Sequence, residues 1–488
     1  MDGHVYLPRL LKGVDLSEKY PEGLNHIKSS TTPESKEDIP VTKIFAEFIA
    51  SVKPDVLSDA LITQLKDYII DYVGVTVAAA HDWESTESIY RGILALGATG
   101  GSNTVILKGQ NFQPQFAGLL NATLGHSMDF DDTYAQGTLH AGVSAISAGL
   151  TQAELLGSHS QQLLLAVAVG YEVICRLGRE LANDAYARGF HNTGTAGIFG
   201  AVATISVLKR LSAKTIENAF GLAVSKAAGS MQYLENGSWN KRLHPGFAVH
   251  DAFVCVSLAE AGVIGAAKSL EGKFGFLQGY SPKPDKDLDY LTADLGARWT
   301  FLETALKPFP ACRMTHGLIE IGGKYGSLSR DRNVEKITIS LSPANLSVVG
   351  HRTSNKLHPE NVVDAQFSAY FQLAHAWLYG SNTGVRCYER LKDSAIYDLS
   401  EKIACVEDVT VKAMGAKMHI QYVDGGQEQI NIPFPLGEPE HPFTKEQIED
   451  KYFGLVVPVL GKVRAEEIRD LVRDLEMHSV VEFFKLVC

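Results

Sequence analysis

The sequence has few cysteines and no closely spaced cysteine pair. Its six cysteines are dispersed over 488 residues, with no Cys-x-x-Cys pair among them. This pattern favours free thiols in a reducing compartment over a disulfide framework. It also disfavours an iron–sulfur cluster, because such clusters usually take closely spaced thiolates.

Long apolar runs and targeting signals are missing as well. No uninterrupted run of about 18 apolar residues occurs, so we expect no membrane span. The N-terminus lacks the apolar core of a signal peptide and carries too many acids for a transit peptide. The last residues, Leu-Val-Cys, match no common address. We therefore expect a cytoplasmic protein, with a mitochondrial location as the alternative.

An excess of basic residues is also absent. The chain has 45 Lys and Arg against 56 Asp and Glu, which gives a net charge of −11. Binding to nucleic acid needs a basic face, so we expect no nucleic-acid partner. A local cluster of cations would stand out in such an acidic chain. The length predicts two domains, because it is too great for one compact core.

The chain divides into segments of different texture. Residues 1–40 are irregular and polar and predict an N-terminal extension. Residues 41 to about 279 follow a helical pattern, and Leu150–Leu181 and Gly194–Leu211 are rich in apolar residues with few charges. Helices of that kind lie at the centre of a large bundle. The first part of the chain is therefore predicted to be a helical domain with a buried centre.

The texture changes near residue 304. Residues 334–341 alternate as a half-buried strand does, and residues 418–423 and 427–432 flank a hairpin turn, Asp-Gly-Gly. Residues 362–379 and 388–403 are predicted to be helices between them. Thr444 and Gln447 form a capping box that starts further helices. We therefore predict a mainly α protein, with a helical domain of residues 41–303 and 442–488 and an inserted α+β domain of residues 304–441.

Acids and a histidine gather between Asp129 and His140. An Asp-Asp-x-x-Asp motif on a helix can bind Mg²⁺ and a diphosphate, but Ala135 stands where the third aspartate should be. The second metal motif of such enzymes is also missing, so a metal site is not predicted. A purely structural explanation of these aspartates is a helix C-terminus capped by polar residues. Among these residues Asp129, Thr133 and His140 are the candidates for a pocket, while Asp131 and Asp132 are predicted to be structural.

His140 and His191 each precede a run of small residues that predicts a helix start. The free N–H groups of a helix N-terminus bind carboxylates. A histidine placed there has a pKa suited to proton transfer near neutrality. Both histidines are therefore candidates for acid/base chemistry, although a lone histidine beside apolar residues is more often part of a core.

Two basic stretches complete the set of candidates. The first is Lys241-Arg-Leu-His244, and the second is residues 307–316, at the predicted domain boundary. Ligand sites favour domain interfaces. Cations from both stretches would hold a ligand with two or three carboxylates. The expected substrate-binding residues are Lys307, Thr133, Arg313, Arg242, His244 and Cys312.

Together these motifs resemble those of the MmgE/PrpD family, which includes 2-methylcitrate dehydratases and cis-aconitate decarboxylases. The matching pieces run nearly end to end, in the family's order. They are Asp71–Gly74, His126–Asp132, Gly170–Val173, Arg176–Gly178, Gly189–Gly197, Lys241–Gly246, Lys307–Cys312, Asp364–Ser368 and Lys451–Phe453.

The resemblance implies a helical domain built from both chain ends, an inserted α+β lid and, usually, a homodimer. It implies lyase chemistry without a metal or organic cofactor. By the family's pattern, the pocket would be lined by Asp129, Thr133, His140, His191, Lys241 and Lys307. One position departs from the animal decarboxylases, which have a histidine where this chain has Cys312. Fungal and dehydratase-like members also tend to lack that histidine, so the subtype stays open.

The expected reaction is dehydration of 2-methylcitrate or a related alkylcitrate. The alternative is decarboxylation of cis-aconitate or an analogue, and a second alternative is a non-catalytic binding protein on the same scaffold. Lys241 and Lys307 would bind carboxylates and stabilise the developing charge. His140 and His191 would transfer protons, and Asp129 would orient or tune an imidazole.

Overall fold

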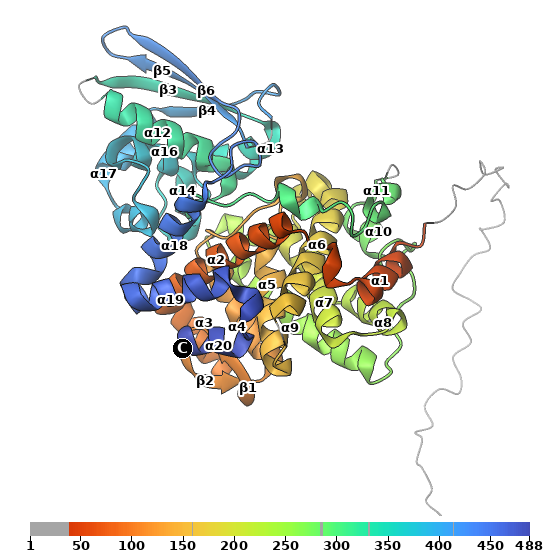
Figure 1. The fold of residues 1–488 in the computed structure, drawn as a ribbon. Helices are drawn as coiled ribbons and strands as arrows, with labels where there is room; N and C mark the ends of the chain where they lie inside the picture. Colours follow the sequence, from red (N-terminus) through yellow and green to blue (C-terminus); the bar gives the residue numbers. More distant parts are fainter. Residues whose placement is uncertain (1–38, 159, 284–285, 330–331, 413) are drawn as a thin grey trace, which may run out of the picture. The chain divides into compact units, whose positions relative to one another are not determined.

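Helices from the two ends of the chain pack together in this computed structural model, which describes residues 39–488 except 159, 284–285, 330–331 and 413. Figure 1 shows the C-terminal helices beside the first ones, and α18 and α19 contact α2 while α20 contacts α5. The predicted extension, residues 1–40, lies outside the described residues up to position 38. The helices of this part are α1 (Val41–Ser51), α2 (Asp59–His81), α3 (Thr86–Leu94), α4 (Pro114–Ser127), α5 (Gly142–Leu156), α6 (Ser160–Ala187), α7 (Asn192–Lys209), α8 (Ala213–Ala223), α9 (Asn240–Glu260), α10 (Phe276–Tyr280), α11 (Leu288–Thr292), α18 (Lys445–Leu460), α19 (Lys462–Arg473) and α20 (Val480–Leu486).

The centre of the helical part is formed by α7, which is buried from Asn192 to Leu208. It packs closely on α6 because small residues face each other. A Cβ on Gly200 would meet Ile174 at 2.1 Å, so a larger residue would force the two helices apart. The predicted apolar stretch Leu150–Leu181 is divided, because α5 ends at Leu156 and Gly157 follows with a φ of 60°. A glycine in this left-handed conformation commonly ends a helix.

A small antiparallel hairpin adds to this part, with β1 (Thr99–Val105) and β2 (Lys108–Phe112). The sequence pattern did not predict it, since β1 is rich in glycine and polar residues and shows no alternation. The turn contains Leu107, whose N–H donates to the carbonyl of Val487 at 2.9 Å. The hairpin therefore ties the C-terminal helices to the rest of the helical part.

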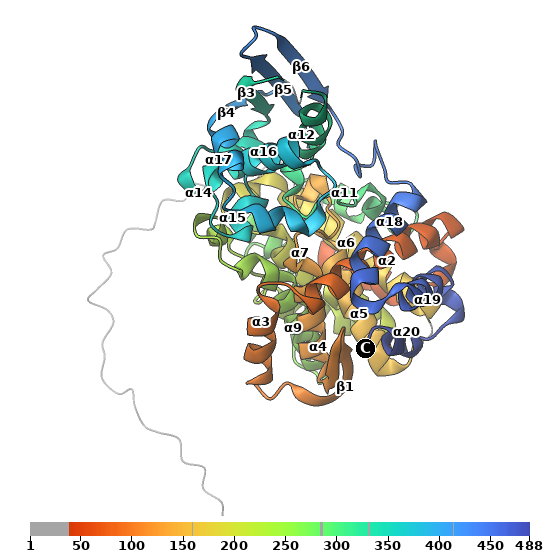
Figure 2. The same cartoon turned by 90° about the vertical axis from the view of Figure 1, so that its left-hand side faces the viewer.

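The inserted segment is a four-stranded sheet covered by helices. The strands run in the order β4-β3-β5-β6, with β3 and β4 parallel and the other pairs antiparallel. Figures 1 and 2 both show α12 and α16 against this sheet, and their apolar residues share its core. The elements are α12 (His316–Leu328), β3 (Val334–Leu341), α13 (Pro343–Asn345), α14 (Ser354–Leu357), α15 (Val362–Gln366), α16 (Ala369–Tyr379), α17 (Ser394–Glu401), β4 (Ile403–Glu407), β5 (Ala416–Tyr422) and β6 (Gln427–Ile432).

The fold class predicted from the sequence is confirmed, with differences in detail. Strand β3 has the predicted bounds, and the Thr444–Gln447 capping box starts α18. The predicted helix 362–379 is two helices, because the side chain of Ser368 accepts from Phe371 N–H and starts α16. The predicted helix 388–403 is wrong at both ends, because α17 spans only Ser394–Glu401 and β4 begins at Ile403 and pairs with β3. The domain boundaries at 303 and 441 stay predictions.

No helix among the described residues is long and apolar enough to cross a membrane.

Candidate active site

The candidate site is built around the loop that follows α4. Asp129 has a φ of 52°, a left-handed conformation that aspartate adopts more readily than most residues. The next residue is held from the far end of the chain. Lys451 of α18 donates to the carbonyl of Phe130 at 2.8 Å and lies 2.6 Å from Asp71 Oδ1 of α2. The loop is therefore anchored between the first and last helical segments.

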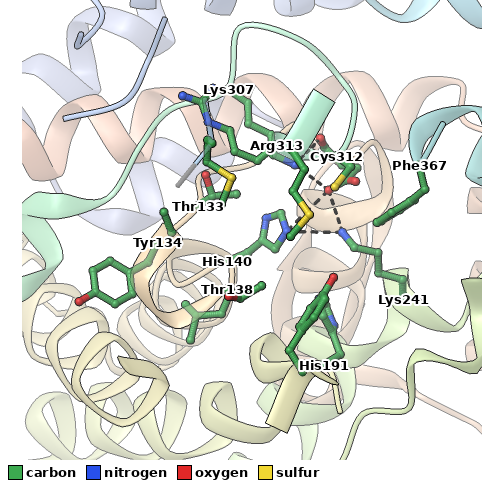
Figure 3. Close-up of a pocket in the computed structure, with 16 residues that line it drawn as sticks. Thr133, Tyr134, Thr138, His140, His191, Lys241, Lys307, Cys312, Arg313 and Phe367 are labelled. Atoms are coloured by element: carbon green, nitrogen blue, oxygen red, sulfur yellow. Dashed lines mark hydrogen bonds and ion pairs between the residues drawn. The ribbon is translucent and has the colours of Figure 1, made fainter. Parts of the chain in front are cut away.

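Asp129 accepts hydrogen bonds from two buried ammonium groups. Lys241, in the first turn of α9, donates to Oδ1 at 2.7 Å. Lys307, in the segment before α12, donates to the same oxygen at 2.7 Å and to the Asp129 carbonyl at 2.8 Å. The dashed lines in Figure 3 show this convergence. The result is one carboxylate between two cations, with a local positive charge that suits an anionic ligand.

The opposite charges of Asp129 and the two lysines shift the pKa values of Asp129 and Lys307. Burial alone would raise the pKa of Asp129, but Lys241 and Lys307 hold it well below its usual value. Burial lowers the pKa of Lys307, and Asp129 opposes that effect. Asp129 is therefore ionised at neutral pH, and its Oδ2 atom is buried with no hydrogen-bond partner among the described residues.

Two imidazoles lie between Asp131 and Lys241. Nδ1 of His126 is 2.8 Å from Asp131 Oδ2, and Nδ1 of His140 is 3.3 Å from the same oxygen. Their Nε2 atoms face Lys241 Nζ at 3.3 and 3.5 Å. Because an ammonium only donates, we infer that both rings carry their proton on Nδ1. Asp131, predicted to be structural, is therefore the carboxylate nearest the imidazoles, and Asp129 is 3.6 Å from His140.

Burial keeps these rings neutral. It lowers the pKa of His126 to about 3 despite the nearby Asp131 charge. Burial also lowers the pKa of His140, with Lys241 adding to the effect and Asp131 opposing it. A neutral imidazole can accept a proton, and the negative charge of a bound polycarboxylate would raise its pKa.

His191 stands at the start of α7, as the sequence predicted, and His140 stands just before α5. The two helix starts are tied together, because the His140 N–H donates to Thr193 Oγ1 at 3.0 Å. Nδ1 of His191 lies 2.9 Å from Nδ1 of His244, so one ring donates and the other accepts. Burial, with the neighbouring His244 and Lys241, lowers the pKa of His191 well below its usual value.

A small cavity lies among these groups, and we call it the inner cavity. Figure 3 shows His140 near its centre, between Lys241 and Thr133. Eight of the ten predicted site residues line it: Asp129, Thr133, His140, His191, Lys241, Lys307, Cys312 and Arg313.

Arg313 and Thr133 line this cavity, and each has one buried polar atom without a hydrogen-bond partner among the described residues. Arg313 is 3% exposed and donates Nε to Glu438 Oε1 at 2.5 Å, but its Nη2 has no partner among the described residues. The same holds for Thr133 Oγ1. Buried donors without partners are costly, so these atoms are candidates to bind a ligand oxygen. Cys312 is a poor nucleophile here, because burial and Asp129 raise its pKa to about 11.

Arg242 and His244 do not belong to the residues that line the inner cavity. Both were predicted as substrate ligands from a basic turn before Pro245, but α9 already begins at Asn240 and runs through that proline. Arg242 therefore points away from Lys241 and pairs with Glu84 at 2.5 Å. His244 supports His191. The geometry gives these two residues positioning contacts instead of a place in the cavity wall.

Several residues of the site were not among the ten predicted from the sequence. His126 sits in the last turn of α4, three residues before Asp129, and was quoted only as part of a family motif. Phe367 came from another such motif. The remaining apolar wall includes Met314, Met414 and Tyr186, which carried no spacing signal.

Two groups of side chains have the spacing of metal ligands. They are His126, His140 and His191, and Asp129, Asp131 and His140. Lys241 Nζ already lies within 3.5 Å of Asp129, His126 and His140. A fixed ammonium at the point where the ligand atoms meet would repel a metal cation. The arrangement therefore suits an anion better than a metal ion.

The neutral state of His244 predicts a pH-dependent stability effect. Burial, with His126 and Lys241, lowers its folded-state pKa to about 3, against about 6.5 in an unfolded chain. Between these values the unfolded chain binds more protons, so this residue costs stability as the pH falls below 6.5. His244→Asn should destabilise the protein at pH 7, and the deficit relative to wild type should shrink by about 3 kcal/mol at pH 4.

Urea unfolding of both proteins between pH 7 and 4 measures this difference. His351→Asn is the matched control, since His351 is exposed. A constant deficit for His244→Asn would show that His244 is not held neutral.

Two family domains match most of the chain. The MmgE/PrpD N-terminal domain matches residues 43–289, and the MmgE/PrpD C-terminal domain matches residues 309–477. The chain is 25% identical over 479 residues to the cis-aconitate decarboxylase-like protein oryM of Aspergillus oryzae, covering 93% of this chain and 97% of that protein. It is 25% identical over 465 residues to a cis-aconitate decarboxylase of Aspergillus terreus, covering 89% and 93%. The human cis-aconitate decarboxylase is 30% identical over 294 residues, 57% of each chain.

Proposed function

The chain belongs to the MmgE/PrpD family, and we propose that it is a cofactor-independent lyase that decarboxylates cis-aconitate or an analogue to an itaconate-type product. From the sequence alone, dehydration of 2-methylcitrate or an alkylcitrate was the first expectation and decarboxylation the alternative. Decarboxylation is placed first because relatives that match nearly the full length carry the names cis-aconitate decarboxylase-like protein and cis-aconitate decarboxylase. The dehydration reading is unconfirmed.

The observation that carries the proposal is the pair of buried lysines on one carboxylate. A polycarboxylate substrate brings its own anions, which can share the donors of Lys241 and Lys307 with Asp129. The free Nη2 of Arg313 offers a third cationic donor from the inserted segment. Three fixed cations around one small cavity match a ligand with three carboxylates.

The reaction follows from the same groups. The bond between the carbon skeleton and one carboxylate breaks, its electron pair stays on the skeleton, and CO2 leaves. The remaining charge is delocalised toward a neighbouring carboxylate, where Lys241 and Lys307 stabilise it. Preorganised charges in a buried site contribute most to this kind of step. A proton then completes the product.

We assign that proton transfer to His140 and His191. Both line the inner cavity and stand at helix starts, and His140 is within 3.5 Å of the Lys241 ammonium. Binding of a trianion raises their pKa and lets one of them arrive protonated. His126, Asp131 and His244 fix the orientation of these rings.

A product assay tests the proposal. The purified protein is incubated with cis-aconitate and with 2-methylcitrate, and CO2 and the unsaturated acids are quantified, with and without a metal chelator. We expect CO2 from cis-aconitate at a rate that the chelator does not change. Loss of water from 2-methylcitrate without CO2 release would favour the dehydratase, and binding of both acids without turnover would favour a binding protein.

His191→Asn provides the internal control for this assay. It should remove most of the activity, while His351→Asn, an exposed histidine, should keep it. Full activity of His191→Asn would contradict the role assigned to His191. We also propose a homodimer, as the resemblance implies, which light scattering of the purified protein can test.

A further inference from the structure

A second cavity adjoins the inner one, and we call it the outer cavity. Ala135 and Met414 line both cavities. The wall between them also contains an ion pair, since Arg313 lines the inner cavity and its partner Glu438 lines the outer one. The two spaces are therefore neighbours that meet at Ala135 and Met414.

The outer cavity has a chemical character opposite to that of the inner one. Its apolar surface comes from Pro433, Phe434 and Pro439, and Phe434 is 42% exposed. No lysine or arginine is among its lining residues, whereas Glu303 and Glu440 are. A carboxylate of the substrate would be repelled there, while an uncharged apolar group would be favoured.

The inner cavity also has an apolar part of its wall. Leu139, Met314 and Met414 line it beside the cations. Each arm of cis-aconitate ends in a carboxylate, so this acid has no apolar substituent to place against them. An apolar wall left facing a polar ligand contributes no affinity.

We propose that the preferred substrate is an aconitate with an alkyl substituent, whose chain passes between Ala135 and Met414 into the outer cavity. This rests on the proposed function, because the carboxylates stay with Lys241, Lys307 and Arg313. The alkyl chain is a spectator: one carbon–carbon bond breaks, CO2 leaves, and a proton replaces it. Glu303 and Glu440 repel the carboxylates of the substrate, so its charged part stays in the inner cavity and its alkyl chain enters the outer one.

The test compares kcat/KM for CO2 release from cis-aconitate and from analogues with methyl, butyl or hexyl groups on the methylene carbon. Each methylene that leaves water should raise kcat/KM by about fourfold until the outer cavity is filled. Values that stay flat or fall with chain length, while cis-aconitate is decarboxylated, would overturn this inference and leave the proposed function standing. No CO2 from any of the four acids would overturn both.

A substitution in the outer cavity tests whether the alkyl chain of the substrate lies there. Phe434→Glu puts a carboxylate on its apolar wall and should lower kcat/KM for the hexyl analogue by about tenfold, with cis-aconitate turnover unchanged. The matched control is Phe274→Glu, since Phe274 is 88% exposed and does not line either cavity. Equal kcat/KM of Phe434→Glu and wild type for the hexyl analogue would overturn the placement.

Discussion

Lys241→Met is expected to lower kcat/KM for cis-aconitate decarboxylation by about 10²–10³-fold. The Lys241 side chain is 8% exposed and its ammonium donates to Asp129, with His126 and His140 next to it. Removing one preorganised donor from a buried site costs a factor of this size. Methionine keeps the length of the side chain, so the main change is the lost charge.

Steady-state kinetics with CO2 detection measure this effect. Asp129 keeps Lys307 as a partner, so the variant should fold, and near-ultraviolet circular dichroism checks that it does. Lys226→Met is the control, because Lys226 is half exposed and forms a surface pair with Asp251. A kcat/KM within threefold of wild type for Lys241→Met would remove Lys241 from the proposed charge stabilisation.

Asp129→Asn is expected to lower the free energy of unfolding by about 3–5 kcal/mol, because two buried ammonium groups lose their shared carboxylate. Asparagine tolerates the left-handed backbone at this position, so the loss reports on charge instead of backbone strain. The deficit should shrink at alkaline pH. Burial already lowers the pKa of Lys307, and without Asp129 this lysine can lose its proton more easily.

Urea unfolding at pH 7 and pH 9.5 measures both parts of this prediction. Asp251→Asn removes a carboxylate from a partly exposed pair and should cost less than about 1 kcal/mol at both pH values. An Asp129→Asn variant as stable as wild type would mean that the two lysines do not depend on Asp129 for their charge.

Regular patterns made part of this structure predictable. The alternation over Val334–Leu341 marks β3 because one face of that strand is buried and the other is not. Strand β4 gives no such signal, since it follows α17 after one residue and depends on pairing with β3. Tertiary pairing, rather than local preference, decides the conformation of such short apolar runs.

The positions of His140 and His191 in the candidate site were predictable, because in the sequence each titratable side chain directly precedes a predicted helix start. The site was not predictable where packing between distant segments decides the contact. His126 becomes part of the site only because Lys241 arrives from α9, and Met414 because the segment after β4 returns over the cavity. The direction of Arg242 depends on where α9 begins, and Pro245 suggested a later start.

The hydrogen bond from Lys451 to the Phe130 carbonyl can form only late in the synthesis of the chain. The two residues are 321 positions apart, and α18 is made only after the whole inserted segment. A growing chain that ends at residue 440 already contains every residue of the inner cavity, yet Asp71 and the Phe130 carbonyl still lack their partner. The ribosome must therefore finish α18 before the loop of Asp129 and Phe130 receives this contact. Shortened chains that stop before residue 445 should carry the complete set of reactive groups and remain inactive.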